Sequence, residues 1–222
     1  MDDLQIRFTR TMEKRSWKTV LVTSALAGEG KTSVAAGLAL QLANKGAKVL
    51  LIDCDLRNPS VAAALGCPQW GGEGGLVDYL KGRCEAADLI QTCEGKTLYV
   101  LPGGKATSHT AALYTNGRWE ALMKEYRDKA DYVIVDTPPC TFMHDTALIA
   151  PALDAGILVV RQDCAPVNRI MAGTEILAQA ELPLAGCVLN GVGSGRGHYG
   201  YGYGYGYGYG HYGYGQYGSY GK

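Results

Sequence analysis

No stretch of the 222-residue chain has the roughly 18 consecutive apolar residues needed to span a bilayer. The first ten residues, MDDLQIRFTR, lack the apolar core of a secretory signal. The seven cysteines are scattered singly without a C-x-x-C pair, so neither a zinc site nor a disulfide framework is predicted. Basic and acidic residues balance at 21 each, whereas a general nucleic-acid binder is usually basic. We therefore expect a protein of the reducing cytoplasm that binds no nucleic acid.

Six runs of aliphatic and β-branched residues are present, at 18–24, 48–53, 98–102, 131–136, 155–161 and 184–190. The runs are continuous rather than alternating, which predicts strands buried on both faces of a parallel sheet. Helix-like segments alternate with them, at 2–16, 32–46, 77–90, 111–129, 145–150 and 167–180. This order predicts an α/β fold with a doubly wound, mostly parallel sheet, in which ligands bind at the carboxyl ends of the strands.

The C-terminal segment has a different composition from the rest of the chain. From residue 193 onward there is no aliphatic residue, and tyrosine mostly alternates with glycine. Such a segment cannot bury enough apolar surface to offset its ordering entropy, so we expect it to be disordered. The predicted organisation is a domain at 1–192, with an N-terminal helix at 1–16, and a tyrosine-rich tail at 193–222. The tail holds ten of the fifteen tyrosines: Tyr199, Tyr201, Tyr203, Tyr205, Tyr207, Tyr209, Tyr212, Tyr214, Tyr217 and Tyr220.

A glycine-containing loop, SALAGEGKT at 24–32, joins the first predicted strand to a helix. Glycines in such a loop let backbone N–H groups turn toward phosphate oxygens, and the helix adds the positive end of its dipole. Lys31 would then reach the β- and γ-phosphates of a nucleotide, and Thr32 would ligate Mg²⁺. Ala25 replaces a glycine of the standard phosphate-binding loop. The predicted nucleotide contacts in the loop are Gly28, Glu29, Gly30, Lys31, Thr32 and Ser33.

Acidic residues stand where two buried strands end. Asp53 and Asp55 close the run VLLIDCD, and Asp136 closes VIVD. Because parallel strands end at one edge of a sheet, these carboxylates are expected beside the phosphate loop, where one can hold magnesium and another can serve the attacking group. Arg57 either clamps a phosphate or forms a surface salt bridge; its residue type does not decide between the two.

The motifs AGEGKT, VLLIDCDLR and VIVDTPP together resemble those of the bacterial tyrosine kinases of capsule and exopolysaccharide synthesis. These are P-loop proteins, and the second motif is the most specific mark of the resemblance. The segments DLRNPS, GLVDYL, LPGGK and VLN are also similar to family blocks in order and spacing. The resemblance covers residues 7–192, and the tyrosine-rich tail is similar to the cluster that this family autophosphorylates.

The resemblance implies an ATP- and Mg²⁺-dependent protein-tyrosine kinase whose substrate is its own tail. By position in the motifs, Lys31 and Thr32 would bind phosphate and Mg²⁺, and Asp55 and Asp136 would lie around the metal. Asp53 would accept the tyrosyl proton, although the division of roles between Asp53 and Asp55 stays open. A base is chemically reasonable because a free phenol has a pKa near 10. Asn190 either contacts adenine, as in relatives, or only caps a turn.

The resemblance also implies partners and an assembly. Family members either follow a transmembrane sensor on one chain or are separate cytoplasmic chains activated by a membrane-anchored protein of the chain-length-determinant type. We expect the second arrangement, at the inner face of the membrane, together with a cognate tyrosine phosphatase. The family's ExxRxxR pattern serves ring assembly; Arg7 and Arg10 fit it, whereas Leu4 stands in place of the glutamate. A ring of unphosphorylated chains is the expected oligomer.

Two other interpretations are open. A partition or division-site ATPase has the same general loop, but it usually carries a lysine where this chain has Leu26. Alternatively, the domain binds nucleotide and the Tyr-Gly tail is adhesive, because such tracts associate by stacking and weak β contacts.

Overall fold

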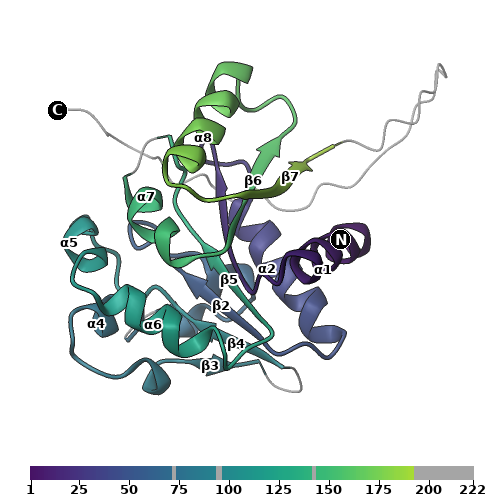
Figure 1. Ribbon diagram of the computed structural model, residues 1–222. Helices are drawn as coiled ribbons and strands as arrows, with labels where there is room; N and C mark the ends of the chain where they lie inside the picture. Colours follow the sequence, from purple (N-terminus) through teal and green to yellow (C-terminus); the bar gives the residue numbers. More distant parts are fainter. Residues whose placement is uncertain (72–73, 94–96, 142–143, 193–222) are drawn as a thin grey trace, which may run out of the picture. The chain divides into compact units, whose positions relative to one another are not determined.

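The computed structural model describes residues 1–71, 74–93, 97–141 and 144–192, and the chain up to Val192 forms one compact unit (Figure 1). Its centre is a seven-stranded sheet in the order β3-β4-β2-β5-β1-β6-β7. The strands are β1 (Thr19–Ser24), β2 (Val49–Asp53), β3 (Gln91–Thr92), β4 (Leu98–Leu101), β5 (Tyr132–Asp136), β6 (Ala155–Arg161) and β7 (Leu184–Asn190). All neighbouring strands are parallel except β3 and β4. The predicted fold class is confirmed; the predicted tail lies outside the described residues.

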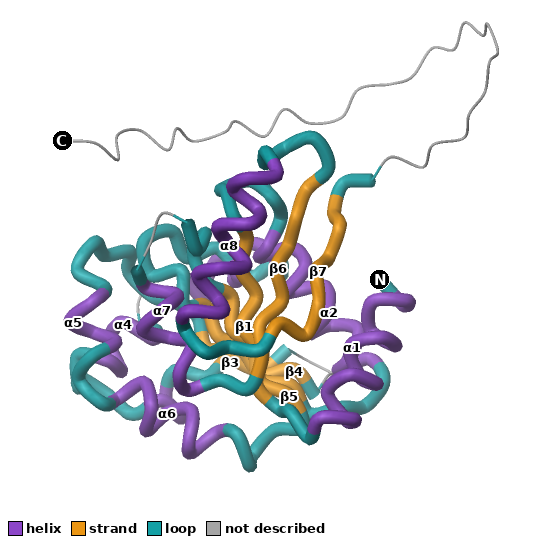
Figure 2. Tube along the Cα trace, turned by 45° about the horizontal axis from the view of Figure 1, so that its top comes forward, coloured by secondary structure: helices purple, strands orange, loops and turns teal. Residues whose placement is uncertain are grey.

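Helices cover both faces of the sheet. They are α1 (Asp2–Arg15), α2 (Lys31–Asn44), α3 (Val61–Ala64), α4 (Leu76–Leu80), α5 (Ala111–Tyr114), α6 (Arg118–Tyr126), α7 (Asp145–Ile149) and α8 (Val167–Gln179), with short 3₁₀ turns η1 (Pro68–Gly71), η2 (Ala86–Asp88) and η3 (Ala150–Ala152). Figure 2 shows α1 and α2 on one side of the strands and α6, α7 and α8 on the other. Successive strand residues point to opposite faces. Val20 and Val22 of β1 accordingly pack in the cluster with α1 and α2, and Leu21 packs in the cluster with α6 and α8.

Several predicted segments are divided differently in the structure. The predicted helix at 77–90 is only the short helix α4, followed by a turn at Gly82 with φ of +72° and by η2. The predicted helix at 111–129 is two helices, α5 and α6, because Gly117 has φ of +81° between them. The short elements α3 and β3 were not predicted. The expectation that every strand is buried on both faces is wrong for β7, which lies at one edge of the sheet and has only exposed and half-buried residues.

The strand order brings the ends of three strands together at one edge of the sheet. Asp53 of β2 is the register partner of Asp136 of β5, and Asp136 is also the register partner of Val22 of β1. The phosphate loop begins at the end of β1, so the fold itself places the loop between β6 and the acidic ends of β5 and β2. Among the described residues, no helix has both the length and the apolar character required to cross a membrane.

Candidate nucleotide and phosphotransfer site

The loop between β1 and α2 has the backbone geometry of an anion-binding turn. Gly28 and Gly30 have φ of +83° and +86°, a region that residues with a Cβ atom rarely adopt. The helix α2 begins at Lys31, directly after Gly30, so its first free N–H groups face the loop. Ser33 lies exposed in the first turn of this helix. Gly30 also has no room for a side chain, because a Cβ atom there would overlap the amide of Asn190.

Glu29 is a fully buried charged residue inside this loop. One carboxylate oxygen accepts a hydrogen bond from the backbone N–H of Leu26 at 2.6 Å, and the other accepts one from the N–H of Arg161 at 3.3 Å. The side chain of Glu29 therefore stabilises the loop through these hydrogen bonds. A contact of this residue with a phosphate would be made by its backbone N–H. Sequence reasoning missed this role, since the motif alone does not say which way the side chain points.

The ends of β6 and β7 support the loop from the other side. The Asn190 side-chain amide donates to the carbonyl of Glu29 at 2.9 Å, and the Arg161 guanidinium donates to the carbonyl of Gly28 at 3.2 Å. Asn190, the last residue of β7, thus lies beside the phosphate loop, and its contact with adenine stays a prediction. Arg161 was not singled out in the sequence. Its only signal there is its place at the end of an apolar run.

Lys31 lies between two of the predicted acids. Its Nζ is 3.0 Å from Oδ2 of Asp55 and 3.8 Å from Oδ2 of Asp136, and all three side chains are buried. Burial alone would lower the pKa of Lys31, but Asp136, Asp55 and Asp53 outweigh it and raise the pKa above its ordinary value. The Thr32 hydroxyl donates to Oδ2 of Asp136 at 2.6 Å. The structure therefore brings together the lysine, the threonine and the acids that the motifs predicted.

Asp53 is differently placed from Asp55. Its Oδ2 accepts hydrogen bonds from the N–H groups of Ser60 and Val61, at 2.8 and 2.9 Å, at the start of α3. Its Oδ1 accepts one from the N–H of Asp55 at 3.2 Å. Burial and then the charge of Asp136 raise the pKa of Asp53, and burial raises the pKa of Asp136 against the opposing effect of Lys31. Asp53 and Asp136, two of the three carboxylates around Lys31, thus have an increased affinity for protons, which offsets part of the negative charge of the cluster.

Arg57 forms a largely buried ion pair instead of reaching the phosphate loop. Its Nε donates to Oδ2 of Asp145 at 3.0 Å, and its Nη2 donates to the hydroxyl of Thr110 at 2.8 Å. The Thr110 hydroxyl in turn donates to Oδ1 of Asp145 at 2.7 Å. Of the two sequence alternatives the structure shows the ion pair, although inside the protein and not on its surface. Asp145 is 88 residues away from Arg57, so no local pattern could have revealed the pairing.

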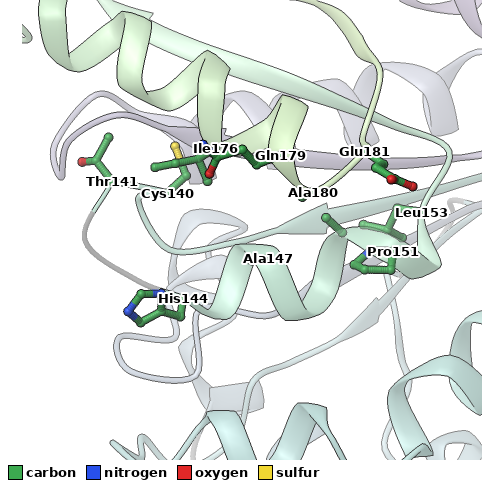
Figure 3. Close-up of a pocket in the computed structure, with 11 residues that line it drawn as sticks. Cys140, Thr141, His144, Ala147, Pro151, Leu153, Ile176, Gln179, Ala180 and Glu181 are labelled. Carbon is green, nitrogen blue, oxygen red and sulfur yellow. The ribbon is translucent and has the colours of Figure 1, made fainter.

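A separate cavity of about 700 Å³ lies between α7 and α8 (Figure 3). Figure 3 shows Ile176 and Gln179 of α8 across from Ala147 of α7. None of the predicted site residues lines this cavity. Its wall contacts the start of the phosphate loop, because the Thr141 hydroxyl donates to the carbonyl of Ala25 at 2.5 Å. The cavity is therefore a neighbour of the site and not the site itself.

The predicted interface residues Arg7 and Arg10 are exposed on α1. They line a groove of about 380 Å³ together with residues of β6 and β7. The ten predicted phosphoacceptor tyrosines lie outside the described residues. Among the described residues, no three His, Cys, Asp or Glu side chains are arranged to hold a metal by themselves.

The fold and loop define a P-loop nucleotide-binding protein, and the family model described as an AAA domain matches residues 17–176. Tyrosine-protein kinase CpsD of Streptococcus agalactiae is 33% identical over 205 residues, which cover 92% of this chain and 82% of that protein. The solved kinase domain of Escherichia coli tyrosine kinase ETK matches with a TM-score of 0.77 and 30% identity, over 90% of this chain and 76% of that one. The chain belongs to the bacterial tyrosine-protein kinases.

The solved cell division ATPase MinD of Pyrococcus furiosus matches too, with a TM-score of 0.67 and 26% identity, over 78% of this chain and 71% of that one. The same general fold thus serves both groups, so the fold alone does not separate the kinase interpretation from the division-site one. The similarity to curated tyrosine kinases over most of both chains favours the kinase interpretation over the division-site one.

Proposed function

We propose that this protein is an ATP- and Mg²⁺-dependent autokinase that phosphorylates the tyrosines of its own tail and thereby regulates capsular or exopolysaccharide synthesis and export. The observation that carries the proposal is the position of Lys31 between Asp55 and Asp136, at the edge where the phosphate loop begins. A P-loop, a lysine and strand-end acids form the arrangement that phosphoryl transfer requires. Because the chain belongs to the tyrosine-protein kinases, the proposed acceptor of the phosphoryl group is a tyrosine side chain.

The residues present fit a magnesium ion. Mg²⁺ prefers oxygen ligands and is usually held by one or two carboxylates together with substrate phosphates. Oδ1 of Asp136 is buried and has no hydrogen-bond partner among the described residues, so it is free to face a cation or a water molecule on it. Thr32 is bonded to the other oxygen of the same carboxylate. Thr32, Asp136 and Asp55 would hold the ion, which neutralises phosphate charge when bound.

The transfer itself needs little covalent participation by the protein. The tyrosyl oxygen forms a bond to the γ-phosphorus, and the bond from this phosphorus to the bridging oxygen of ADP breaks. The tyrosyl proton passes to a carboxylate, for which Asp53 is the proposed base and Asp55 the alternative. Lys31 and the N–H groups of the loop stabilise the negative charge that moves onto the phosphate oxygens. Asn190, which already contacts the loop, is the proposed adenine contact.

The proposal also includes two protein partners and an oligomer. A membrane-anchored activator of the chain-length-determinant type would bring the protein to the inner face of the membrane, and a cognate tyrosine phosphatase would reverse the reaction. Unphosphorylated chains would assemble as a ring through α1. The exposure of Arg7 and Arg10 beside a groove at β7 supports this part.

The test is a labelling experiment on three proteins. The full chain, the chain cut after Val192 and the Lys31→Met variant are incubated with ATP and Mg²⁺, with and without a cytoplasmic peptide of the activator, and probed for phosphotyrosine. Labelling of the full chain alone supports an autokinase that modifies its tail. Strong labelling of the shortened chain would move the acceptors to Tyr79, Tyr99, Tyr114, Tyr126 or Tyr132. Nucleotide hydrolysis without any phosphotyrosine would instead favour a partition-type ATPase.

A further inference from the structure

A groove of about 650 Å³ lies on the edge of the sheet that carries the proposed catalytic acids, between α4 and the segment that follows β4. The cations Lys81, Arg83 and Lys105 line it, against the single described carboxylate of Asp78. All three cations are exposed. The residues that line the groove thus carry three cations against one carboxylate, in a protein whose net charge is zero, and the carboxylates of Glu85 and Asp88 lie outside this lining.

Among the described residues, Arg83 is the one of these three cations that forms an ion pair. Nη1 of Arg83 lies 2.9 Å from Oδ1 of Asp78, whereas Lys81 and Lys105 form no ion pair within the described parts of the chain. The hydroxyl of Thr107 adds a polar group to the lining, and Ala106 adds an apolar surface. Two unpaired ammonium groups beside an apolar wall suit a ligand that carries about two negative charges next to an apolar body.

The groove is attached to the segment that bears the catalytic acids. The backbone N–H of Thr107 donates to the carbonyl of Leu56 at 2.8 Å, one residue after Asp55. Gly103 packs so closely on this segment that a Cβ atom there would lie 2.9 Å from Pro59 and 3.3 Å from the carbonyl oxygen of Asp53. A ligand in the groove would thus bind beside the phosphotransfer site without occupying the phosphate loop.

We propose that this groove binds a phosphotyrosine of the tail, an inference that rests on the proposed autokinase function. A phosphotyrosine carries about −1.5 to −2 charges at neutral pH, which matches two unpaired lysines. Its aromatic ring supplies the apolar body. The tail contains ten tyrosines in a glycine-rich segment, so a chain that has reacted once offers this ligand at high local concentration.

The tail is long enough to reach the groove from its own domain or from a neighbour. It starts after Val192, beyond β7, and five strand spacings of about 4.8 Å, roughly 24 Å in all, separate β7 from β4 in the sheet. Both strands end at the same edge because every strand between them is parallel. A glycine-rich segment of 30 residues spans about 30 Å on average. Capture of the first phosphotyrosine would hold the next tyrosines close to the catalytic edge, and so favour repeated phosphorylation of one tail.

Binding can be measured without any kinase activity. The probe is a fluorescent peptide GYGYGYG, with the sequence of residues 202–208 and a synthetic phosphate on its central tyrosine. Its affinity for the full, phosphatase-treated chain is followed by fluorescence anisotropy without ATP. We expect binding that is about tenfold or more tighter than that of the unphosphorylated peptide, and that weakens with salt. Equal affinity of the two peptides would overturn the proposal.

Two pairs of variants locate the binding. Lys81→Gln/Lys105→Gln should weaken phosphopeptide binding about tenfold or more, whereas the matched pair Lys14→Gln/Lys45→Gln removes two exposed lysines elsewhere and should leave it unchanged. Lys31→Met should also leave it unchanged. Loss of binding in Lys31→Met alone, in a protein whose circular dichroism matches that of the wild type, would place the phosphopeptide at the phosphate loop and overturn the inference. Competition by inorganic phosphate as strong as that by phosphopeptide would reduce the groove to an unspecific anion site.

The functional consequence has its own readout. In a partial reaction the wild-type chain should accumulate multiply phosphorylated molecules, and Lys81→Gln/Lys105→Gln should accumulate singly phosphorylated ones, as counted by mass spectrometry of intact protein. The same distribution in both would contradict repeated capture. Because the peptide is phosphorylated chemically, a failure of the autokinase proposal leaves the binding result intact, and the two failures can be told apart.

Discussion

Replacement of Lys31 by methionine should affect stability as well as catalysis, because this lysine is the cation of a buried cluster. Its side chain is 11% exposed, and its Nζ lies 3.0 Å from Oδ2 of Asp55 and 3.8 Å from Oδ2 of Asp136. Removal of one partner of a buried ion pair costs about 3–5 kcal/mol, since a charge is left without compensation. For a domain of this size, such a loss corresponds to a decrease of about 6–20 °C in Tm. The measurement is made without nucleotide or Mg²⁺.

The loss of stability in Lys31→Met should depend on pH and should be larger at high pH than at low pH. Asp53 and Asp136 have folded-state pKa values above those of the unfolded chain, so the folded protein binds more protons and gains stability as the pH falls toward the unfolded values. Without Lys31 these pKa values rise further. If the variant takes up one proton more than the wild type between pH 8 and pH 6, its deficit shrinks by about 1.36 kcal/mol for each pH unit, or about 2.7 kcal/mol.

Urea unfolding of the wild type and Lys31→Met at both pH values tests this reasoning. We expect a deficit of about 3–5 kcal/mol at pH 8 that falls to about 0–2 kcal/mol at pH 6. Lys31→Met/Asp55→Asn should regain stability at pH 8, and Lys45→Met, at an exposed lysine, should behave like the wild type. A deficit that is the same at both pH values, or absent at pH 8, would refute the view that Lys31 balances the acids.

Asp136→Asn should decrease phosphotyrosine labelling at least about a hundredfold, because it removes a proposed metal ligand; labelling near the wild-type rate would exclude that role. Arg57→Ala should destabilise the fold by about 3 kcal/mol in urea, since Asp145 stays buried without its cation, and Arg57→Ala/Asp145→Asn should recover most of this loss. Light scattering at matched salt should show larger particles for the unphosphorylated protein than for the phosphorylated one, because each phosphate adds about −1.5 to −2 charges to crowded tails; equal masses would contradict control of assembly by the tail.

The strands were predictable because a strand that is buried on both faces appears in the sequence as a continuous apolar run. The runs VLLID and YVIVD contain no polar residue before the terminal acid, and both strands are buried nearly throughout. The prediction of burial on both faces was wrong for a strand that lies at an edge of the sheet. The run LAGCVLN also has no polar residue before its last position, but it forms β7 at an edge of the sheet, and a continuous apolar run does not by itself distinguish an edge from a centre.

The acids of the site were predictable for a topological reason. Parallel strands end at one edge, so acids at the ends of two apolar runs lie on the same edge as a loop at the end of a third, and the adjacent positions of β2, β5 and β1 bring them together. The pairings within the site were not predictable. The contacts of Glu29 with Arg161 and of Arg57 with Asp145 join residues 132 and 88 positions apart, and such pairs depend on how loops fold back over the edge.

Charge explains why the site should prefer a magnesium complex of the nucleotide to the nucleotide alone. Asp53, Asp55 and Asp136 contribute −3 when ionised and Lys31 contributes +1, so the cluster has a formal charge of −2. Burial first, and then the charge of a neighbouring carboxylate, raise the pKa values of Asp53 and Asp136, so bound protons relieve part of this negative charge.

A divalent cation would neutralise the cluster and release Lys31 to the phosphates, whereas a free polyphosphate would add negative charge while Lys31 stays committed to Asp55. Binding of nucleotide with Mg²⁺ is therefore expected to exchange one set of ion pairs for another, and to release the protons that the acids had taken up.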